Sequence, residues 1–416
     1  TQAKTVADLP APQRRERIIH DLAEALDTHV YEGRVKGKNR LGFFRPVNRE
    51  VRIKNAADIE VAAHELAHLV DNKIPSLSAA WRSDKALREE LKSVSYDQKN
   101  VKEGFAEAVR LWATQGDVLE AKAPRVFKWL EDFANSHEYG PPLRLAQSRM
   151  HAWFEQDALN RARSKIGDPD KLGNSPIMQH LGDWWKQQRK EWRQSVSDDL
   201  AGLYDAERSL TGKISPAGAY ETARLSRAAP SITDGAIRFG APLRKADGSY
   251  TFTGKGLHEI LRPVSGRIED FMLYAVGKSA QELMNQKREN LFSPTEIEAM
   301  VKLETPELRT ALNEFQTWNR AIVDYAQAHG VVNAESRAMW NRQIYLPFWR
   351  VSQPGEWKGG KVGDWKGVQA LTGGTSNVRD ILSNVIGNAN LLITKARVND
   401  ARARTVKLIM ENKGGH

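Results

Sequence analysis

The chain has 416 residues, and its 62 lysines and arginines outnumber its 52 aspartates and glutamates, so its formal net charge is +10. It contains no cysteine, which excludes disulfide bonds, thiol catalysis and cysteine-based zinc sites. No apolar run is long enough to span a bilayer. This length predicts two or three domains. The chain begins with threonine and without a signal peptide, so we expect a processed chain or a piece of a longer one.

The first predicted elements are a helix and a β-hairpin. The helix is expected from residue 13 to about residue 26. Residues 41–46 and 51–54 predict two strands, and residues 47–50 have the composition of the turn between them.

A mostly apolar run at residues 59–70 predicts a buried helix that contains an H-E-x-x-H pentapeptide at residues 64–68. His64 and His68 are one helical turn apart, so both imidazoles face one point and can bind a zinc ion. Glu65 is then placed to take a proton from zinc-bound water. An exposed helix with scattered polar residues is the alternative. Buried His and Glu side chains need partners, which favours the metal site.

A second helix, predicted at residues 102–112, can supply the third ligand that such a zinc site needs. Glu103 and Glu107 are one turn apart and share a face of this helix. A carboxylate from that face completes a site of two histidines and one glutamate. A pair of solvent-exposed glutamates is the alternative, but the semi-apolar helix favours at least one inward carboxylate.

The stretch from residue 102 to residue 112, continuing to residues 123–127, resembles the third-ligand helix of the anthrax lethal factor catalytic domain and its relatives, the Pro-Pro endopeptidases. Their pattern is Glu-x-Phe-Ala-Glu, in which the first glutamate binds zinc. The resemblance implies that Glu103 is the zinc ligand and that Glu107 supports the site. It also implies that Tyr96, seven residues before Glu103, stabilises the oxyanion or protonates the leaving amine.

The resemblance runs from about residue 59 to residue 127. It includes Asp71, which we expect to support the site without binding metal, and it departs at Ala67, where lethal factor has glycine. It implies a gluzincin-like zinc metallopeptidase that acts on a polypeptide substrate. His64, His68 and Glu103 would hold Zn²⁺, with Glu65 as the general base and Tyr96 as a donor to the oxyanion.

In zincins the strand nearest the metal helix is a sheet edge, along which substrate can lie by strand addition. The hairpin upstream of residues 64–68 is the expected place for this edge. A plain scaffold hairpin would have the same sequence pattern, so both interpretations stay open.

The zincin-like module is predicted at residues 1–140, because a helix at residues 124–134 is followed by the sequence Tyr-Gly-Pro-Pro, which breaks helices. The next helix, from residue 143 to about residue 165, is expected to lead away from the module. A helical connector is predicted at residues 141–214 and a mainly helical region at residues 215–416. The predicted fold class is therefore an α+β zincin-like metallopeptidase domain followed by a mainly α-helical region.

Several helix signals recur in the C-terminal part. We expect helices at residues 178–210, 265–285 and 378–410, helix starts at Ser215-Pro216, Ser293 and Thr305, a helix stop at Gly330, a hairpin at residues 247–249 and a mobile loop at residues 354–367. No second catalytic constellation accompanies them, and His258 and His329 are interpreted as ordinary histidines.

A looser resemblance covers residues from about 215 to 410. The stretches at residues 254–261, 271–283, 322–330 and 345–348 together resemble helical segments of large polyvalent proteins of tailed phages. Those proteins are packaged in the virion and enter the host with the DNA, and lethal-factor-like modules occur in them. The resemblance implies a location inside the phage virion, delivery into the host cell and other virion proteins as partners. A cytoplasmic location is the alternative.

Basic residues form three clusters: Arg14, Arg15 and Arg17; Lys186, Arg189, Lys190 and Arg193; and Arg397, Arg402, Arg404 and Lys407. Each cluster could contact the phosphates of a nucleic acid. An exposed amphipathic helix has the same pattern and is the commoner explanation.

Two classes of function stay open on the sequence alone. The first is an active zinc endopeptidase carried in a larger phage protein. The second is a non-catalytic structural or ejection protein in which the zincin fold is vestigial. The complete set of His64, Glu65, His68, Tyr96 and Glu103 favours the first, because a decayed site usually loses its base or a ligand.

Overall fold

The structure is a computed structural model that describes residues 5–6, 9–33, 35, 40–55, 57–166, 200–226, 229–245, 249–289, 291–333, 337, 344, 346 and 381–411. Several predictions lie outside these residues: the basic cluster at residues 186–193, most of the helix at residues 178–210, the tip of the hairpin at residues 247–249, the loop at residues 354–367 and most of the stretch at residues 345–348.

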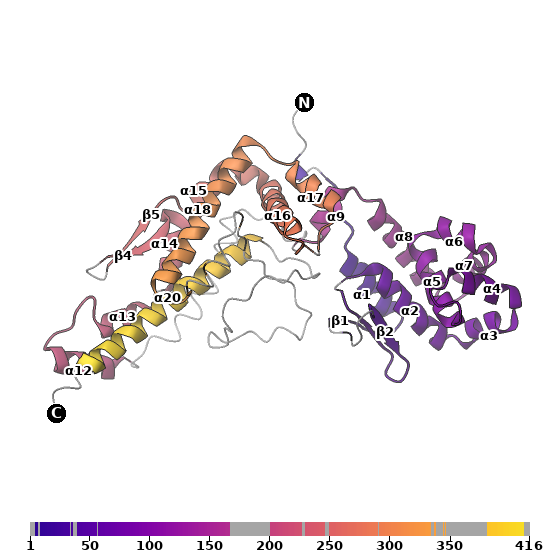
Figure 1. Ribbon diagram of the computed structural model, residues 1–416, viewed down its shortest axis with the longest axis horizontal. Helices are drawn as coiled ribbons and strands as arrows, with labels where there is room; N and C mark the ends of the chain where they lie inside the picture. Colours follow the sequence, from indigo (N-terminus) through magenta and orange to yellow (C-terminus); the bar gives the residue numbers. More distant parts are fainter. Residues whose placement is uncertain are drawn as a thin grey trace.

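The described chain is mostly helical, with two small sheets, and it forms two lobes (Figure 1). The predicted helix-rich character with a small sheet is therefore confirmed, whereas the zincin assignment stays a prediction. None of the described helices combines the length and the apolar character that crossing a membrane requires.

The sheet of the first lobe contains β1 (Val30–Glu32), β2 (Gly42–Arg45) and β3 (Glu50–Ile53) in the order β1-β3-β2. Strand β1 runs parallel to β3, and β2 runs antiparallel to it, with Gly42 opposite Ile53 and Arg45 opposite Glu50. The predicted hairpin is therefore confirmed. Because β3 lies in the middle of the sheet, β2 forms one of its edges.

Two helices beside this sheet carry the sequence motifs. Helix α2 (Ile59–Lys73) begins after Asp58, whose side chain accepts a hydrogen bond from the backbone of Val61. Helix α5 (Val101–Thr114) begins after Asn100, which caps it in the same way. The two helices pack against each other and α2 also contacts β2 and β3, so residues of α2 lie between the sheet and α5.

The other helices of this lobe surround α2 and α5. They are α1 (Arg15–Ala25), α3 (Pro75–Ser83), α4 (Lys85–Val94), α6 (Gly116–Lys122), α7 (Pro124–Ser136) and α8 (Gly140–Glu155). Together they bury one hydrophobic core that extends from Ile18 to Trp153.

Helix α8 packs against α1, α5 and α7. The expectation that the helix from residue 143 to about residue 165 leads away from the module is therefore wrong for the part in α8, and only residues 158–164 continue to the second lobe. Leu143, Ala146, Met150 and Trp153 follow a helical spacing and are buried in the first core. The prolines at residues 141 and 142 lie in the first turn of the helix, where backbone N–H groups lack intrahelical partners in any case. The Tyr-Gly-Pro-Pro sequence therefore marks a helix start.

The second lobe is built from helices around a second core. They are α12 (Ala201–Thr211), α13 (Ala219–Ser226), α14 (Ala229–Phe239), α15 (Leu257–Leu261), the 3₁₀ helix η2 (Arg262–Arg267), α16 (Ile268–Asn285), α17 (Pro294–Val301), α18 (Pro306–Ala328) and α20 (Ile381–Glu411). A hairpin of β4 (Ala241–Arg244) and β5 (Tyr250–Thr253) completes the lobe.

The helix starts predicted in this lobe have different outcomes. Ser293 forms the expected capping box with Glu296, and Thr305 caps α18. The start predicted at Ser215-Pro216 is wrong, because α13 begins at Ala219. The carboxylate of Glu207 accepts hydrogen bonds from the backbone of Ser215 and Tyr220, so it provides the acceptor that a capping serine would otherwise supply.

The lobes meet where α9 (Ala158–Ser164) lies beside α17 (Figure 1). Lys165 is buried there, and its Nζ donates to both carboxylate oxygens of Glu296, at 2.9 and 2.7 Å. Val6, close to the start of the chain, also lies in the second core, and its backbone N–H donates to Asp270 at 2.8 Å. The chain therefore crosses twice between the lobes.

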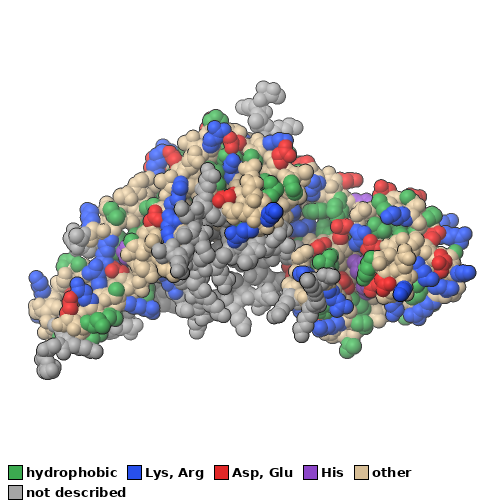
Figure 2. Space-filling model, in the orientation of Figure 1, with side chains coloured by type: hydrophobic (Ala, Val, Ile, Leu, Met, Phe, Trp, Pro, Cys, Tyr) green, Lys and Arg blue, Asp and Glu red, His purple; other side chains and the backbone are tan. Residues whose placement is uncertain are grey.

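Lysine and arginine side chains are spread over the visible face of both lobes, with acidic side chains among them (Figure 2). In the C-terminal basic cluster, Arg397 is fully buried, so the expectation that this residue could contact a nucleic acid is wrong. Arg402 of the same helix is exposed.

Candidate metal centre

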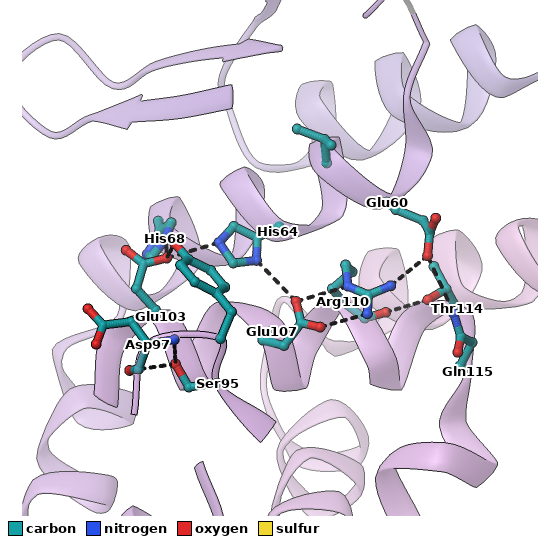
Figure 3. Close-up of polar contacts among 12 residues, drawn as sticks. Glu60, His64, His68, Ser95, Asp97, Glu103, Glu107, Arg110, Thr114 and Gln115 are labelled. Carbon is teal, nitrogen blue, oxygen red and sulfur yellow. Dashed lines mark hydrogen bonds and ion pairs between the residues drawn. The ribbon is translucent and has the colours of Figure 1, made fainter. Parts of the chain in front are cut away.

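Three predicted ligands meet between α2 and α5 (Figure 3). The Nε2 atom of His64 lies 3.2 Å from Oε2 of Glu103, and Nε2 of His68 lies 3.5 Å from the same oxygen. One donor atom from each of the three side chains lies within 4.8 Å of the others. The helical spacing of the histidines and the contact of α2 with α5 together produce this convergence.

These distances fit a four-coordinate zinc ion. Bonds of about 2.0–2.1 Å in a tetrahedral arrangement place neighbouring ligand atoms roughly 3.3 Å apart. The two nitrogen–oxygen separations, 3.2 and 3.5 Å, lie on either side of that value. Two imidazoles and one carboxylate are also a donor set that zinc accepts while a fourth position stays open.

Glu65 lies beside this group on the side of β2. The residue is buried, with 8% of its surface exposed, yet it lines the pocket that contains the histidines. Burial raises the pKa of its carboxyl group, although the histidines partly offset the effect. A carboxylate with a raised pKa accepts a proton more readily at neutral pH, which suits a general base.

Gly42 of β2 explains how Glu65 fits against the sheet. A Cβ atom at residue 42 would lie 2.7 Å from Oε1 of Glu65 and 2.9 Å from Cγ1 of Val61. Both distances are shorter than ordinary van der Waals contacts, so a larger residue would displace the carboxylate. The glycine therefore lets the edge strand approach the base closely.

A chain of charged groups supports His64 on the side away from Glu103 (Figure 3). Its Nδ1 atom lies 3.5 Å from Oε2 of Glu107. Arg110 donates to both carboxylate oxygens of Glu107, at 3.0 and 2.7 Å, and to Glu60 at 2.5 Å. A carboxylate on the second ring nitrogen fixes the orientation of a ligating histidine, and Arg110 in turn fixes that carboxylate.

The charges of the centre affect the protonation of His64 and Glu103. Burial alone would lower the pKa of His64, but hydrogen bonds to Glu103 and Glu107 and the charge of Glu65 outweigh it and raise the pKa to about 9. Hydrogen bonds from His64 and His68 hold the pKa of Glu103 well below its usual range. A proton on His64 balances the carboxylates without metal, and a divalent cation would replace that proton.

Tyr96 lies in the loop between α4 and α5 and has 75% of its surface exposed. Its hydroxyl nevertheless donates to Oε2 of Glu103 at 2.6 Å. Partial burial of the hydroxyl and the contact with Glu103 raise the pKa of Tyr96 well above its usual value. The phenol therefore keeps its proton and can act as a hydrogen-bond donor at the centre.

Asp71 supports the centre only indirectly. Its Oδ1 atom accepts hydrogen bonds from Oγ of Ser78 at 2.6 Å and from Nε1 of Trp81 at 3.3 Å. These contacts join the end of α2 to α3.

Sequence reasoning assigned no role to Arg110 or Glu60. The spacing of Glu107 and Arg110 by three residues on one helix was a signal for the ion pair between them.

The centre opens into a cavity of about 1080 Å³. One wall is strand β2 with the aromatic side chains of Phe43 and Phe44, and the other walls come from α2, α5 and the loop that carries Tyr96. This volume slightly exceeds the range of roughly 300–1,000 Å³ that small-molecule sites occupy, so the cavity has room for several residues of an extended peptide.

A second group of possible ligands among the described residues, His20, Asp21 and Glu24, differs in character. Asp21 there forms ion pairs with Arg17 and Arg149, and the group lies on the outer face of α1. Asp21, the middle residue of this group, therefore already has two cationic partners.

No protein-family model, curated protein or solved structure matches this chain. The assignment of the centre depends on the geometry of its own residues.

Proposed function

We propose that the chain is a zinc-dependent endopeptidase. The observation that carries this proposal is the convergence of His64, His68 and Glu103 at distances that fit one zinc ion, with Glu65 beside them in a large open cavity. A structural zinc site normally has four protein ligands, whereas three ligands and an open position are typical of a catalytic one.

The side chains of the centre have separate roles in this proposal. A bound zinc ion would polarise the substrate carbonyl and lower the pKa of a water molecule toward neutrality. Glu65 takes the proton of the attacking water and passes it to the nitrogen of the leaving amine. The hydroxyl of Tyr96 donates a hydrogen bond to the oxygen on which negative charge develops. Glu107 and Arg110 hold the ring of His64 in place.

Substrate binding is proposed along β2. This strand is a sheet edge that borders the cavity, and an extended peptide can add to such an edge through backbone hydrogen bonds. The peptide would then pass beside Glu65, because Gly42 of β2 faces that carboxylate. From the sequence resemblance alone, we further propose that the enzyme is part of a large phage protein, with itself, a virion protein or a host protein as the substrate.

The proposal is tested with purified protein. Metal analysis after gentle purification should find one zinc per chain, and mass spectrometry should detect cleavage of a peptide library. A Glu65→Gln variant should keep its zinc and its fold but lose hydrolysis by a factor of roughly 10²–10⁴. Glu120 is exposed on α6, so Glu120→Gln is the matched control. Absence of zinc, or full activity of Glu65→Gln, would exclude the proposed mechanism.

A further inference from the structure

A group of arginines is buried in the second lobe, far along the chain from the metal centre. Arg397 of α20 is fully buried, and its Nε, Nη1 and Nη2 atoms have no hydrogen-bond partner among the described residues. Its guanidinium group lies over the ring of Tyr250 on β5, 4.2 Å from the ring centroid. An aromatic face offers a cation weak attraction, but it accepts none of the five hydrogen bonds that a guanidinium can donate.

Two further arginines lie near Arg397. Arg244 of β4 has 9% of its side chain exposed, and Arg404 of α20 has 34% exposed. Burial lowers the pKa of Arg397, and repulsion from Arg244 and Arg404 adds to the effect, so that the pKa is about 10. We call Arg244, Arg397 and Arg404 the arginine cluster.

The negative charge beside the cluster is smaller than the positive charge of its three arginines. Asp400 contacts both Arg244 and Arg404. Arg244 and Arg404 also donate to neutral oxygens, Oγ1 of Thr222 and the carbonyl oxygen of Ala217. Among these described residues, the three guanidinium groups of the cluster face one carboxylate, which leaves a net charge of +2.

The hydroxyl groups around the cluster also lack acceptors. The Oη atoms of Tyr250 and Tyr325 are buried without a hydrogen-bond partner among the described residues. Tyr250 lies beneath Arg397 and Arg244, and Tyr325 of α18 interacts electrostatically with Arg244. Buried donors and charges without partners destabilise the folded state, because folding removes them from water and no new hydrogen bond or ion pair replaces the lost hydration. Guanidinium and phenol donors from β4, β5, α18 and α20 therefore lie near one another, and a single carboxylate among the described residues faces them.

We propose that the arginine cluster binds a small tetrahedral oxyanion of the phosphate class. Its two negative charges would balance the cluster, and phosphate oxygens accept hydrogen bonds from guanidinium groups in a geometry that arginine favours. A nucleic-acid backbone or a protein surface does not fit this role, because Arg397 has 0% of its surface exposed. The anion would join α18, α20 and the β4–β5 hairpin, so it stabilises the second lobe.

The test uses the full chain purified in chloride buffer free of phosphate and sulfate. Thermal unfolding and isothermal titration calorimetry are measured with inorganic phosphate against chloride of equal ionic strength. A saturable rise in the unfolding temperature with phosphate is expected. A parallel titration with glycerol phosphate distinguishes free phosphate from a phosphoryl group on a larger molecule, because a closed site should admit only the former.

Variants assign the effect to the cluster. Arg397→Met should weaken phosphate binding by roughly 10- to 100-fold, and it should fold, because replacing a buried unpaired charge by an apolar side chain is often neutral or stabilising. Tyr250→Phe should weaken binding by about 2- to 10-fold. Arg402→Met, at an exposed arginine of the same helix, is the matched control and should bind normally. The absence of a saturable response, or an equal response in Arg397→Met, would overturn the proposal.

Discussion

The Nδ1 atom of His64 lies 3.5 Å from Oε2 of Glu107, while Nε2 of the same ring faces Glu103. In the proposed site, Nε2 would therefore bind the metal, and Nδ1 faces a carboxylate that Arg110 holds in place. This division would make the affinity for the proposed metal depend on Glu107, which is not a proposed ligand.

Glu107→Gln is expected to lower zinc affinity by roughly 10- to 100-fold, because the ring of His64 loses its charged partner and binds metal less strongly. Competition with a chromophoric chelator measures the affinity. Glu120→Gln, on an exposed face of α6, provides the baseline. An unchanged zinc affinity in Glu107→Gln would mean that Glu107 serves the packing of α5 alone.

Tyr96→Phe is expected to lower kcat by roughly 10²–10³, because a preorganised donor to the developing oxyanion is removed. Zinc content and KM should change little, since the hydroxyl contacts Glu103 and does not replace a ligand. Steady-state kinetics on a cleaved library peptide test this split between kcat and KM. Tyr31→Phe, on β1 and outside the lining of the cavity, should behave like the unmodified protein. A change in KM alone would mean that the Tyr96 hydroxyl contributes to substrate binding and not to stabilisation of the oxyanion.

Gly42→Ala is expected to lower kcat by up to about 100-fold, because the added methyl group displaces the carboxylate of Glu65 and small misplacements of catalytic groups are costly. The new Cβ would lie 2.7 Å from Oε1 of Glu65. Zinc binding should persist, since Glu65 is not a proposed ligand. At Gly116, by contrast, the nearest atom to an added Cβ lies at an ordinary 3.6 Å, so Gly116→Ala should keep full activity. Equal activity of both variants would contradict the close packing of β2 on Glu65.

The stability of the second lobe is expected to decrease in mild acid because of His329. Burial lowers the pKa of His329 below its ordinary value of 6.5, and Arg244 and Arg404 add to the effect, while a hydrogen bond to the backbone of Tyr325 partly offsets it. The folded chain therefore binds a proton less readily than the unfolded chain. Stability contributed by the neutral ring is complete above about pH 6.5 and decreases as the pH falls through the lowered pKa.

Urea unfolding at pH 7.5 and pH 5.5, in buffer free of phosphate, measures this dependence. His329→Gln keeps a side-chain donor for the carbonyl of Tyr325 but does not titrate, so its loss of stability between the two values should be smaller. His258 is exposed on α15, and His258→Gln should retain the full dependence. If His329→Gln loses as much stability in acid as the unmodified chain, other groups must cause the change.

The parts of the fold that were predicted from sequence are those governed by neighbours in the chain. His64 and His68 share a face because they lie on one helix, and Ser293 caps α17 through a residue three positions away. The β2–β3 hairpin likewise depends on a short turn. Such relationships need only helical or strand periodicity, which is visible in the sequence.

The parts that were missed depend on how distant elements pack. The contact between Arg110 and Glu60 is set by the crossing of α2 and α5, and the approach of Gly42 to Glu65 by the position of the sheet on α2. Arg397 was grouped with exposed basic residues, because the repeat of charges along one helix does not show which face a hairpin will cover. The pattern of charges in the sequence therefore did not distinguish the buried Arg397 from the exposed Arg402 of the same helix.

The double crossing between the lobes has a consequence for any self-cleavage. The first segment runs from Val6 to α1, and the second runs from α8 to α9. The two are joined, because the backbone N–H of Gln13 donates to the side chain of Gln156 at 2.8 Å. A single nick in either segment would leave the half with the candidate metal centre attached through the other. Liberation of that half from its neighbour therefore requires two scissions, so a partly processed chain would still migrate as one particle until a denaturant separates the pieces.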